Sequence, residues 1–159
     1  MEKSELLHLQ VVVELPYRWA AGRNGSLMLK ALRDEKKIIG NRCPECRKVY
    51  VPPRAVCGPC FIAPDETVEL PATGILAGYS VVNYPFIDPE TGEKRPVPYT
   101  YGYIQLDGCD SYLSHFVNET DPARLSPGLR VEAVFKPDGE RVGQMQDILH
   151  FKVSEEKGG

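Results

Sequence analysis

Apolar and polar residues alternate along five stretches in the second half of the chain. These stretches cover residues 74–84, 99–106, 111–117, 129–135 and 148–153. An alternation of period two puts successive side chains on opposite faces, so each stretch is predicted to be a half-buried β-strand. Residues 107–110 (Asp-Gly-Cys-Asp) and 137–140 (Pro-Asp-Gly-Glu) are turn sequences of the kind that join hairpin strands.

The connections between these strands favour one fold. A long polar loop at 85–98 separates the first two strands, and residues 118–128 separate the third from the fourth. Within that second connection, residues 121–125 could form one helical turn. Five strands with a helical insert between the third and fourth are typical of an OB-fold barrel. Periodicity alone also allows an open five-stranded sheet or a small sandwich.

The first half of the chain has fewer strand signals. Residues 26–35 are predicted to form a helix, with Ser26 as its N-cap and with Met28, Leu29 and Leu32 as its apolar stripe. Residues 61–73 contain two prolines and three acidic residues and are predicted to be a linker. The chain as a whole is therefore expected to be mainly β with an N-terminal helical segment.

Both ends of the chain carry separate predictions. Residues 9–15 are predicted to form a short strand. Pro16 would end it, because proline cannot donate a hydrogen bond to a neighbouring strand. The aromatic cluster at 17–19 (Tyr-Arg-Trp) either packs on its own domain or forms an arm that docks on a partner. Residues 154–159 are predicted to be a disordered tail.

Charge is distributed unevenly along the 159 residues. Residues 1–60 carry eleven Lys/Arg and six Asp/Glu, a balance of +5, whereas residues 61–159 carry eight and sixteen, a balance of −8. No apolar stretch approaches the length of a membrane span, and the N-terminus does not resemble a secretory signal. The protein is expected to be cytosolic, where its five cysteines would stay reduced.

Four of these cysteines form two CxxC knuckles that are separated by ten residues, Cys43/Cys46 and Cys57/Cys60. Two facing knuckles supply four thiolates in a tetrahedron, which is the ligand set of a structural Zn²⁺ site with no open position for catalysis. Iron in a rubredoxin-like site and a pair of redox-active dithiols are the alternatives. Between the knuckles, residues 49–54 are predicted to be a short hairpin strand, with Arg54 on the ribbon surface.

Candidate catalytic groups are few outside the knuckles. Cys109 stands alone in a turn, and a catalytic thiol needs a neighbouring base. The histidines are His8, His115 and His150, and the last two fall within strand patterns. No GxSxG, P-loop or HExxH motif occurs in the sequence. The sequence therefore predicts no self-contained active site.

The order of these motifs resembles the DUF35 family of zinc-ribbon and OB-fold proteins. The similarity covers about residues 17–153 and rests on residues 40–46 (GNRCPEC), residues 51–54 (VPPR) and residues 57–60 (CGPC). It implies an N-terminal helical segment, a rubredoxin-like zinc ribbon and a C-terminal five-stranded OB-fold barrel. The corresponding boundaries are 1–40, 41–63 and 64–153.

The resemblance also implies a function. Family members accompany thiolases or related acyl-CoA enzymes as non-catalytic subunits, so a hetero-oligomer is expected, with acyl-CoA shared with the partner. Residues 16–22 are similar to members found beside thiolases of aromatic and steroid degradation, such as the thiolase of benzoylsuccinyl-CoA in anaerobic toluene breakdown. Lys94 and Arg95 are the only cations in the 85–98 loop, which makes them candidates for contacts to CoA phosphates.

Nucleic-acid binding is the alternative function, because zinc ribbons and OB-folds often serve it. Six aromatic side chains could stack on bases: Tyr79, Tyr84, Phe86, Tyr99, Tyr101 and Tyr103. Lys94 and Arg95 are the only cations over residues 74–116, however, and the second half of the chain is acidic. The charge pattern therefore disfavours a nucleic-acid partner.

Overall fold

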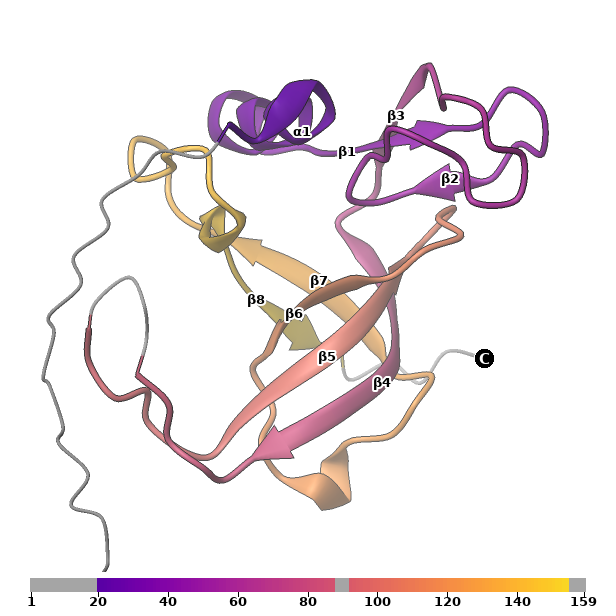
Figure 1. The fold of residues 1–159 in the computed structure, drawn as a ribbon. Coiled ribbons are helices and arrows are strands. Elements are labelled where there is room, and N and C mark those ends of the chain that lie inside the picture. The colour runs from indigo at the N-terminus through magenta and orange to yellow at the C-terminus, as the bar shows by residue number, and fades with distance from the viewer. Residues whose placement is uncertain (1–19, 88–91, 155–159) are drawn as a thin grey trace, which may run out of the picture.

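The computed structural model describes residues 20–87 and 92–154. The predicted strand at 9–15, the aromatic cluster at 17–19 and the tail from residue 155 onward lie outside the described residues. No helix in the described part is long and apolar enough to cross a membrane. In Figure 1 the helix α1 and a small sheet lie next to each other above a β-barrel.

The helix α1 spans Gly22–Glu35 and buries Met28, Ala31 and Leu32 along one face. The prediction that Ser26 is the N-cap is wrong, because the helix begins one turn earlier after Ala21. A capping preference of about 1 kcal/mol acts only where the chain leaves the helix, and here the preceding residues complete another turn.

The ribbon sheet contains three antiparallel strands in the order β2-β1-β3. They are β1 (Ile38–Arg42), β2 (Val49–Tyr50) and β3 (Glu66–Leu70). The prediction of a linker over 61–73 is wrong for β3, which pairs with β1 along its full length, from Ile38 opposite Leu70 to Arg42 opposite Glu66. An ion pair between Arg42 and Glu66 closes one end of this ladder.

The second half of the chain forms a closed barrel with the strand order β4-β5-β6-β8-β7. Its strands are β4 (Thr73–Val82), β5 (Tyr99–Leu106), β6 (Leu113–Val117), β7 (Arg130–Phe135) and β8 (Ile148–Val153). The pairing of β6 with β8 is parallel, and the other four strand pairs are antiparallel. The OB-fold prediction is confirmed, and the open sheet and the sandwich are excluded.

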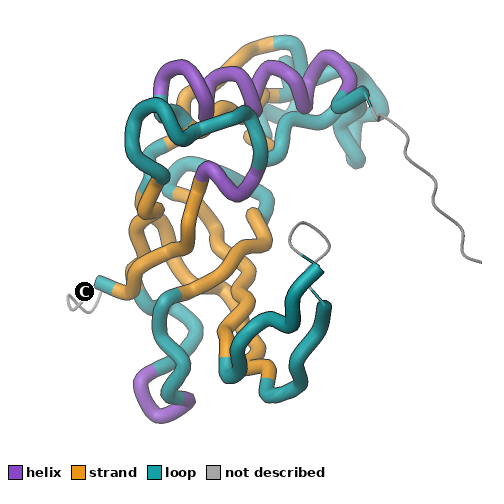
Figure 2. Tube along the Cα trace, turned by 90° about the vertical axis from the view of Figure 1, so that its left-hand side faces the viewer, coloured by secondary structure: helices purple, strands orange, loops and turns teal. Residues whose placement is uncertain are grey.

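Two short 3₁₀-helices interrupt the barrel connections. The helical insert predicted between the third and fourth barrel strands is η1 (Pro122–Arg124), which Asp121 caps by accepting a hydrogen bond from the Ala123 N–H. The second, η2 (Met145–Asp147), leads into β8. Figures 1 and 2 place η1 at the end of the barrel that faces away from α1 and the ribbon.

One continuous apolar core connects the helix, the ribbon and the barrel. The buried cluster includes Met28 and Leu32 from α1, Ile38 from β1, and Val49 and Val51 from the ribbon. The barrel contributes Leu76, Ile104, Leu106, Leu113, Val131, Ile148 and Phe151. Because these side chains pack against each other, the three parts of the chain are expected to unfold together.

Hydrogen bonds also join the ribbon to the barrel along residues 49–51. The Val49 N–H donates to the Asp110 carboxylate at 2.8 Å, and the Asp110 N–H donates to the Val49 carbonyl at 2.9 Å. The Ser111 hydroxyl accepts from the Val51 N–H at 2.8 Å and donates to the Val51 carbonyl at 2.9 Å. The β5–β6 turn thus takes the place of a neighbouring strand along this edge of the ribbon.

Replacing Ser111 with alanine is expected to destabilise the whole chain. The change leaves the Val51 N–H and carbonyl without their partner in a buried place, which costs about 1–3 kcal/mol. Urea unfolding of the zinc-loaded protein measures this loss. Ser114→Ala is the control, because Ser114 is half-buried on β6 and its hydroxyl makes no hydrogen bond to a described residue. Equal stability of the two variants would contradict the role given to this joint.

Candidate metal centre and barrel groove

The two cysteine knuckles adopt the same backbone turn. In the first, the Cys43 N–H donates to the Lys48 carbonyl at 2.9 Å and the Arg47 N–H donates to the Cys43 carbonyl at 3.0 Å. In the second, Cys57, Phe61 and Ile62 repeat this pattern with two bonds of 2.8 Å. The residue after the last cysteine of each knuckle is left-handed, with φ of 60° at Arg47 and 58° at Phe61. At each of these two positions the backbone has a conformation that glycine adopts most easily.

These turns bring the four predicted metal ligands together. The Sγ atoms of Cys43, Cys46, Cys57 and Cys60 all lie within 4.8 Å of one another, and those of Cys46 and Cys57 are 3.5 Å apart. Four thiolates at 2.3 Å from one Zn²⁺ would have sulfur–sulfur distances of about 3.8 Å. The four thiols are therefore positioned for a metal ion and fit a closed structural zinc site.

Tyr50 extends this centre beyond its ligands. Its hydroxyl lies 3.2 Å from the Cys57 Sγ, and its ring packs among the cysteines. A phenol that donates to a thiolate favours the charged sulfur, so Tyr50 lowers the pKa of Cys57 to about 6. The same hydrogen bond raises the pKa of Tyr50 to about 12. Gly40 permits this packing, because a Cβ there would lie 2.6 Å from the Tyr50 carbonyl oxygen.

Asn41 supports the second knuckle from β1. Its side-chain amide donates to the Arg54 carbonyl at 2.7 Å and to the Pro64 carbonyl at 3.0 Å, and its oxygen accepts from the Arg54 N–H at 3.0 Å. The Arg54 guanidinium lies 4.8 Å from the centre of the Tyr50 ring. Arg54 is exposed on the ribbon surface, as predicted. Asn41 thus holds the backbone before the second knuckle at Arg54 and after it at Pro64.

A groove of about 570 Å³ lies on the outside of the barrel over β5. Alternation along β5 turns Thr100, Gly102 and Ile104 inward and leaves three tyrosines outside: Tyr99, Tyr101 and Tyr103. Tyr101 is 42% exposed and Tyr103 is 59% exposed. The three tyrosines therefore share one face, as the sequence predicts, and that face is open to solvent.

Aromatic rings from neighbouring segments line the same groove. Phe116 of β6 makes edge contacts to Tyr99 and Tyr101, with ring centres 5.9 and 5.1 Å apart. Phe86 of the 85–98 loop meets Tyr99 in the same manner at 5.7 Å. Such pairs stabilise a packed aromatic surface beyond the area that they bury. The groove is therefore an ordered aromatic platform.

Lys94 and Arg95, the predicted CoA contacts, lie differently. The Arg95 guanidinium lines the groove 4.1 Å from the centre of the Phe116 ring and 5.7 Å from that of Phe86. The backbone N–H of Arg95 donates to the Phe86 carbonyl at 2.9 Å. Lys94 forms a β-bridge with Ile87, and its side chain is exposed without lining the groove.

The remaining candidates occupy structural positions. Cys109 is buried in the joint between ribbon and barrel, with its Sγ 3.4 Å from the Val49 carbonyl. His115 is buried on β6, and its Nε2 lies 3.1 Å from the Met145 carbonyl. Burial lowers the pKa of His115 and of His150, which favours the neutral imidazole in both. His8 lies outside the described residues.

Sequence reasoning missed Tyr50, Asn41 and Phe116 as parts of these sites. Tyr50 and Asn41 flank the knuckles in sequence, but only the pairing of β1 with β2 brings them to the sulfur atoms and the second knuckle. Phe116 shares the groove because β5 pairs with β6, with Tyr101 opposite Phe116. The alternation in β6 was the available signal, since it puts Phe116 outside the barrel.

Two family profiles match this chain over consecutive regions. Residues 30–64 match the ChsH2 rubredoxin-like zinc ribbon domain, and residues 67–136 match the ChsH2 C-terminal OB-fold domain. A DUF35 domain-containing scaffold protein of Methanocaldococcus jannaschii is 32% identical over 113 residues, which are 69% of this chain and 77% of that protein. The zinc ribbon and the four clustered thiols together support a structural zinc ion.

Two solved structures are similar in fold. One is the Ltp2-ChsH2(DUF35) aldolase, with a TM-score of 0.62, 20% identity, and coverage of 86% of this chain and 98% of that one. The other is a DUF35 protein of unknown function from Sulfolobus solfataricus, with a TM-score of 0.59, 21% identity, and coverage of 84% and 87%. At these identities the similarity supports the helix–ribbon–barrel fold alone.

Removing the Tyr50 hydroxyl is expected to weaken the metal centre. Tyr50→Phe deletes the hydrogen bond to the Cys57 Sγ, and the loss of such a supporting contact typically lowers metal affinity roughly tenfold. Competition against a chromogenic zinc chelator at pH 7 measures the change. Tyr112→Phe is the control, because Tyr112 is exposed on the barrel. Unchanged zinc affinity in Tyr50→Phe would contradict the role assigned to this hydroxyl.

Proposed function

Because this chain belongs to the DUF35 family of zinc-ribbon and OB-fold proteins, we propose that it is a non-catalytic accessory subunit of an acyl-CoA enzyme complex. The relative from Methanocaldococcus jannaschii is named a scaffold protein, and one of the similar solved structures is named an Ltp2-ChsH2(DUF35) aldolase. The partner proposed for this chain is a thiolase-type enzyme. The proposed role of this chain is to stabilise that enzyme and to help position the acyl-CoA.

The exposed aromatic groove carries this proposal. Tyr101 and Tyr103 present large apolar surfaces to solvent on a rigid strand, and Arg95 lies against the adjoining Phe116. Tyrosine, phenylalanine and arginine are enriched where proteins bind one another, and monomeric proteins seldom expose such surfaces together. The groove is thus suited to cover a matching apolar surface of an enzyme subunit.

Acyl-CoA would meet this chain at the edge of the same groove. Lys94 and Arg95 are proposed to contact the CoA phosphates, and the neighbouring rings supply an apolar wall for the rest of the molecule. Arg95 is already stacked on Phe116, which fixes the direction of its guanidinium. Lys94 is exposed and can reorient towards a phosphate.

The metal is proposed to be a structural Zn²⁺ held by Cys43, Cys46, Cys57 and Cys60. Four protein ligands complete the coordination, so the ion would take no part in a reaction. The ion would contribute free energy of folding, because it would link the two knuckles, which precede and follow β2 in the sequence. The ribbon in turn packs against the helix and the barrel through the shared core.

Co-purification tests the accessory role. The tagged full-length chain, purified from the cells that express it naturally, is expected to elute with a thiolase-type subunit encoded by a neighbouring gene. The double variant Tyr101→Ala, Tyr103→Ala is expected to weaken that complex about tenfold, because it removes both exposed aromatic side chains from the groove. Leu149→Ala, which shortens an exposed apolar side chain on β8, is the control.

A chain that elutes only as a monomer would contradict this proposal. Salt-sensitive binding of oligonucleotides at micromolar concentration, lost in the same double variant, would instead favour the nucleic-acid alternative.

Removal of zinc is expected to loosen both the fold and the assembly. A strong chelator should lower the melting temperature of the isolated chain and release the partner, because structural zinc supplies part of the free energy of folding. Circular dichroism and size-exclusion chromatography of the complex measure the two effects, and added Zn²⁺ should reverse them. If metal loss abolished activity while the assembly stayed intact, the structural role would be wrong.

A further inference from the structure

The surrounding backbone supports the two knuckles differently. The first knuckle, residues 43–48, closes the hairpin of β1 and β2, and these strands pair directly before and after it. The second knuckle, residues 57–62, has no paired strands beside it. Among the described residues, no backbone hydrogen bond joins residues 52–56 to residues 63–65. Strand pairing therefore does not hold together the chain on the two sides of the second knuckle.

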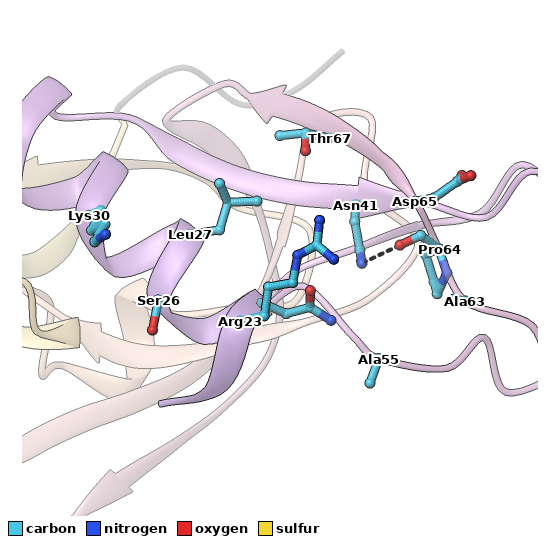
Figure 3. A pocket seen from close by; sticks show the side chains of 11 residues that line it. Arg23, Ser26, Leu27, Lys30, Asn41, Ala55, Ala63, Pro64, Asp65 and Thr67 are labelled. Carbon is cyan, nitrogen blue, oxygen red and sulfur yellow. Dashed lines mark hydrogen bonds between the residues drawn. The ribbon is translucent and has the colours of Figure 1, made fainter. Parts of the chain in front are cut away.

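The side chain of Asn41 provides the hydrogen bonds that strand pairing does not. Its amide nitrogen donates to the carbonyl of Arg54, before the second knuckle, and to the carbonyl of Pro64, after it, at 2.7 and 3.0 Å. Its oxygen accepts from the Arg54 N–H at 3.0 Å. Figure 3 shows Asn41 with the bond to Pro64 as a dashed line. One amide on β1 thus joins the two ends of this knuckle.

The surroundings of Asn41 require an amide at this position. Asn41 is 4% exposed and lines a hollow of about 720 Å³ between α1 and the ribbon. Two carbonyl oxygens face its nitrogen and one N–H faces its oxygen, so both kinds of atom are needed. An apolar residue, or one with acceptors alone, would leave buried backbone groups without partners.

The same hydrogen bonds connect the two pairs of thiols. Asn41 precedes Cys43 by two residues, so its position on β1 is tied to the first knuckle. Its bonds fix the chain three residues before Cys57 and four residues after Cys60. Ligands that are already in place lose less conformational entropy when they bind. Asn41 therefore brings the second pair of thiols to the first before any ion links them.

We propose that Asn41 is a positioning residue of the metal centre, which holds the second knuckle closed and thereby slows the release of the ion. This role rests on the structural Zn²⁺ proposed above, although Asn41 itself is not a ligand. The second pair of ligands, Cys57 and Cys60, depends on it, whereas the β1–β2 hairpin holds Cys43 and Cys46. Loss of the Asn41 amide should therefore loosen one knuckle and leave the other in place.

Zinc release and amide hydrogen exchange of the full-length, zinc-loaded chain test this role. Asn41→Asp keeps the size of the side chain and its acceptor, but it removes the donors and places a carboxylate against two carbonyls. Transfer of zinc to a chelator is expected to be about tenfold faster or more. Hydrogen exchange measured by NMR should also be about tenfold faster at the N–H groups of Cys57 and Phe61. The corresponding groups of the first knuckle, at Cys43 and Arg47, should not change.

Two control variants separate positioning from general destabilisation. Asn24 of α1 lines the same hollow and makes no hydrogen bond to a described residue, so Asn24→Asp should release zinc at the wild-type rate. Val131→Ala removes buried methyl groups from the barrel and should lower the melting temperature. It should not make exchange in the second knuckle faster relative to the first. Asn41→Leu, which fills the space but makes no hydrogen bond, should behave like Asn41→Asp.

The wild-type protein gives a measurement that does not depend on any variant. The Arg54 N–H lies outside every strand, but its acceptor is the buried Asn41 oxygen. It is therefore expected to exchange as slowly as the N–H groups of the central strand β1. Exchange as fast as at Gly139, which lies in an exposed turn, would contradict the proposed role of Asn41.

Other outcomes would overturn this role. They are wild-type zinc release from Asn41→Asp, equal loosening of both knuckles, or the same asymmetry between the knuckles in Val131→Ala. Elemental analysis of the wild-type chain after loading with Zn²⁺ separates these outcomes from failure of the metal site itself. If the wild type holds no zinc, the structural zinc is wrong. If it holds zinc and the Asn41 variants retain the ion equally well, only the positioning role of Asn41 is wrong.

Discussion

The segment at residues 49–51 is hydrogen-bonded along both of its edges, and the arrangement of the whole protein depends on it. On one side it pairs with β1, with Asn41 opposite Tyr50 and Arg42 opposite Val49. On the other side, the turn at 109–111 supplies a carboxylate, a hydroxyl and backbone groups in place of a strand. Since buried backbone groups must find partners, the ribbon can bind the barrel here in only one register.

The metal centre is coupled to the same segment. Tyr50 lies between the two hydrogen-bonded valines and directs its hydroxyl to the Cys57 Sγ, 3.2 Å away. Val49 and Val51 point the other way, into the core shared with the helix and the barrel. Alternation along three residues therefore connects the sulfur cluster on one face with the apolar core on the other. A metal bound by the cysteines would stabilise the attachment of the ribbon without contacting the barrel.

The barrel groove proposed for binding lies on one of the parts that this joint holds together. It presents aromatic side chains from a closed sheet. It is rigid before any partner binds, because paired strands fix its backbone. Preorganised surfaces lose little conformational entropy on binding, which suits a protein whose proposed role is to hold other proteins.

The sequence by itself determined the local features of this protein. Period-two alternation located the five barrel strands, and CxxC spacing located the four thiols, because both patterns act over a few neighbouring residues. Only the tertiary structure decided the rest. The strand at 66–70 exists because β1 supplies its partner, and the helix begins at Gly22 although Ser26 is the better cap. Tyr50 meets Cys57 through the turn of the second knuckle, and Phe116 meets Tyr101 through the pairing of β5 with β6. Such contacts depend on which strands become neighbours, and that choice is made by burial of the shared core over the whole chain.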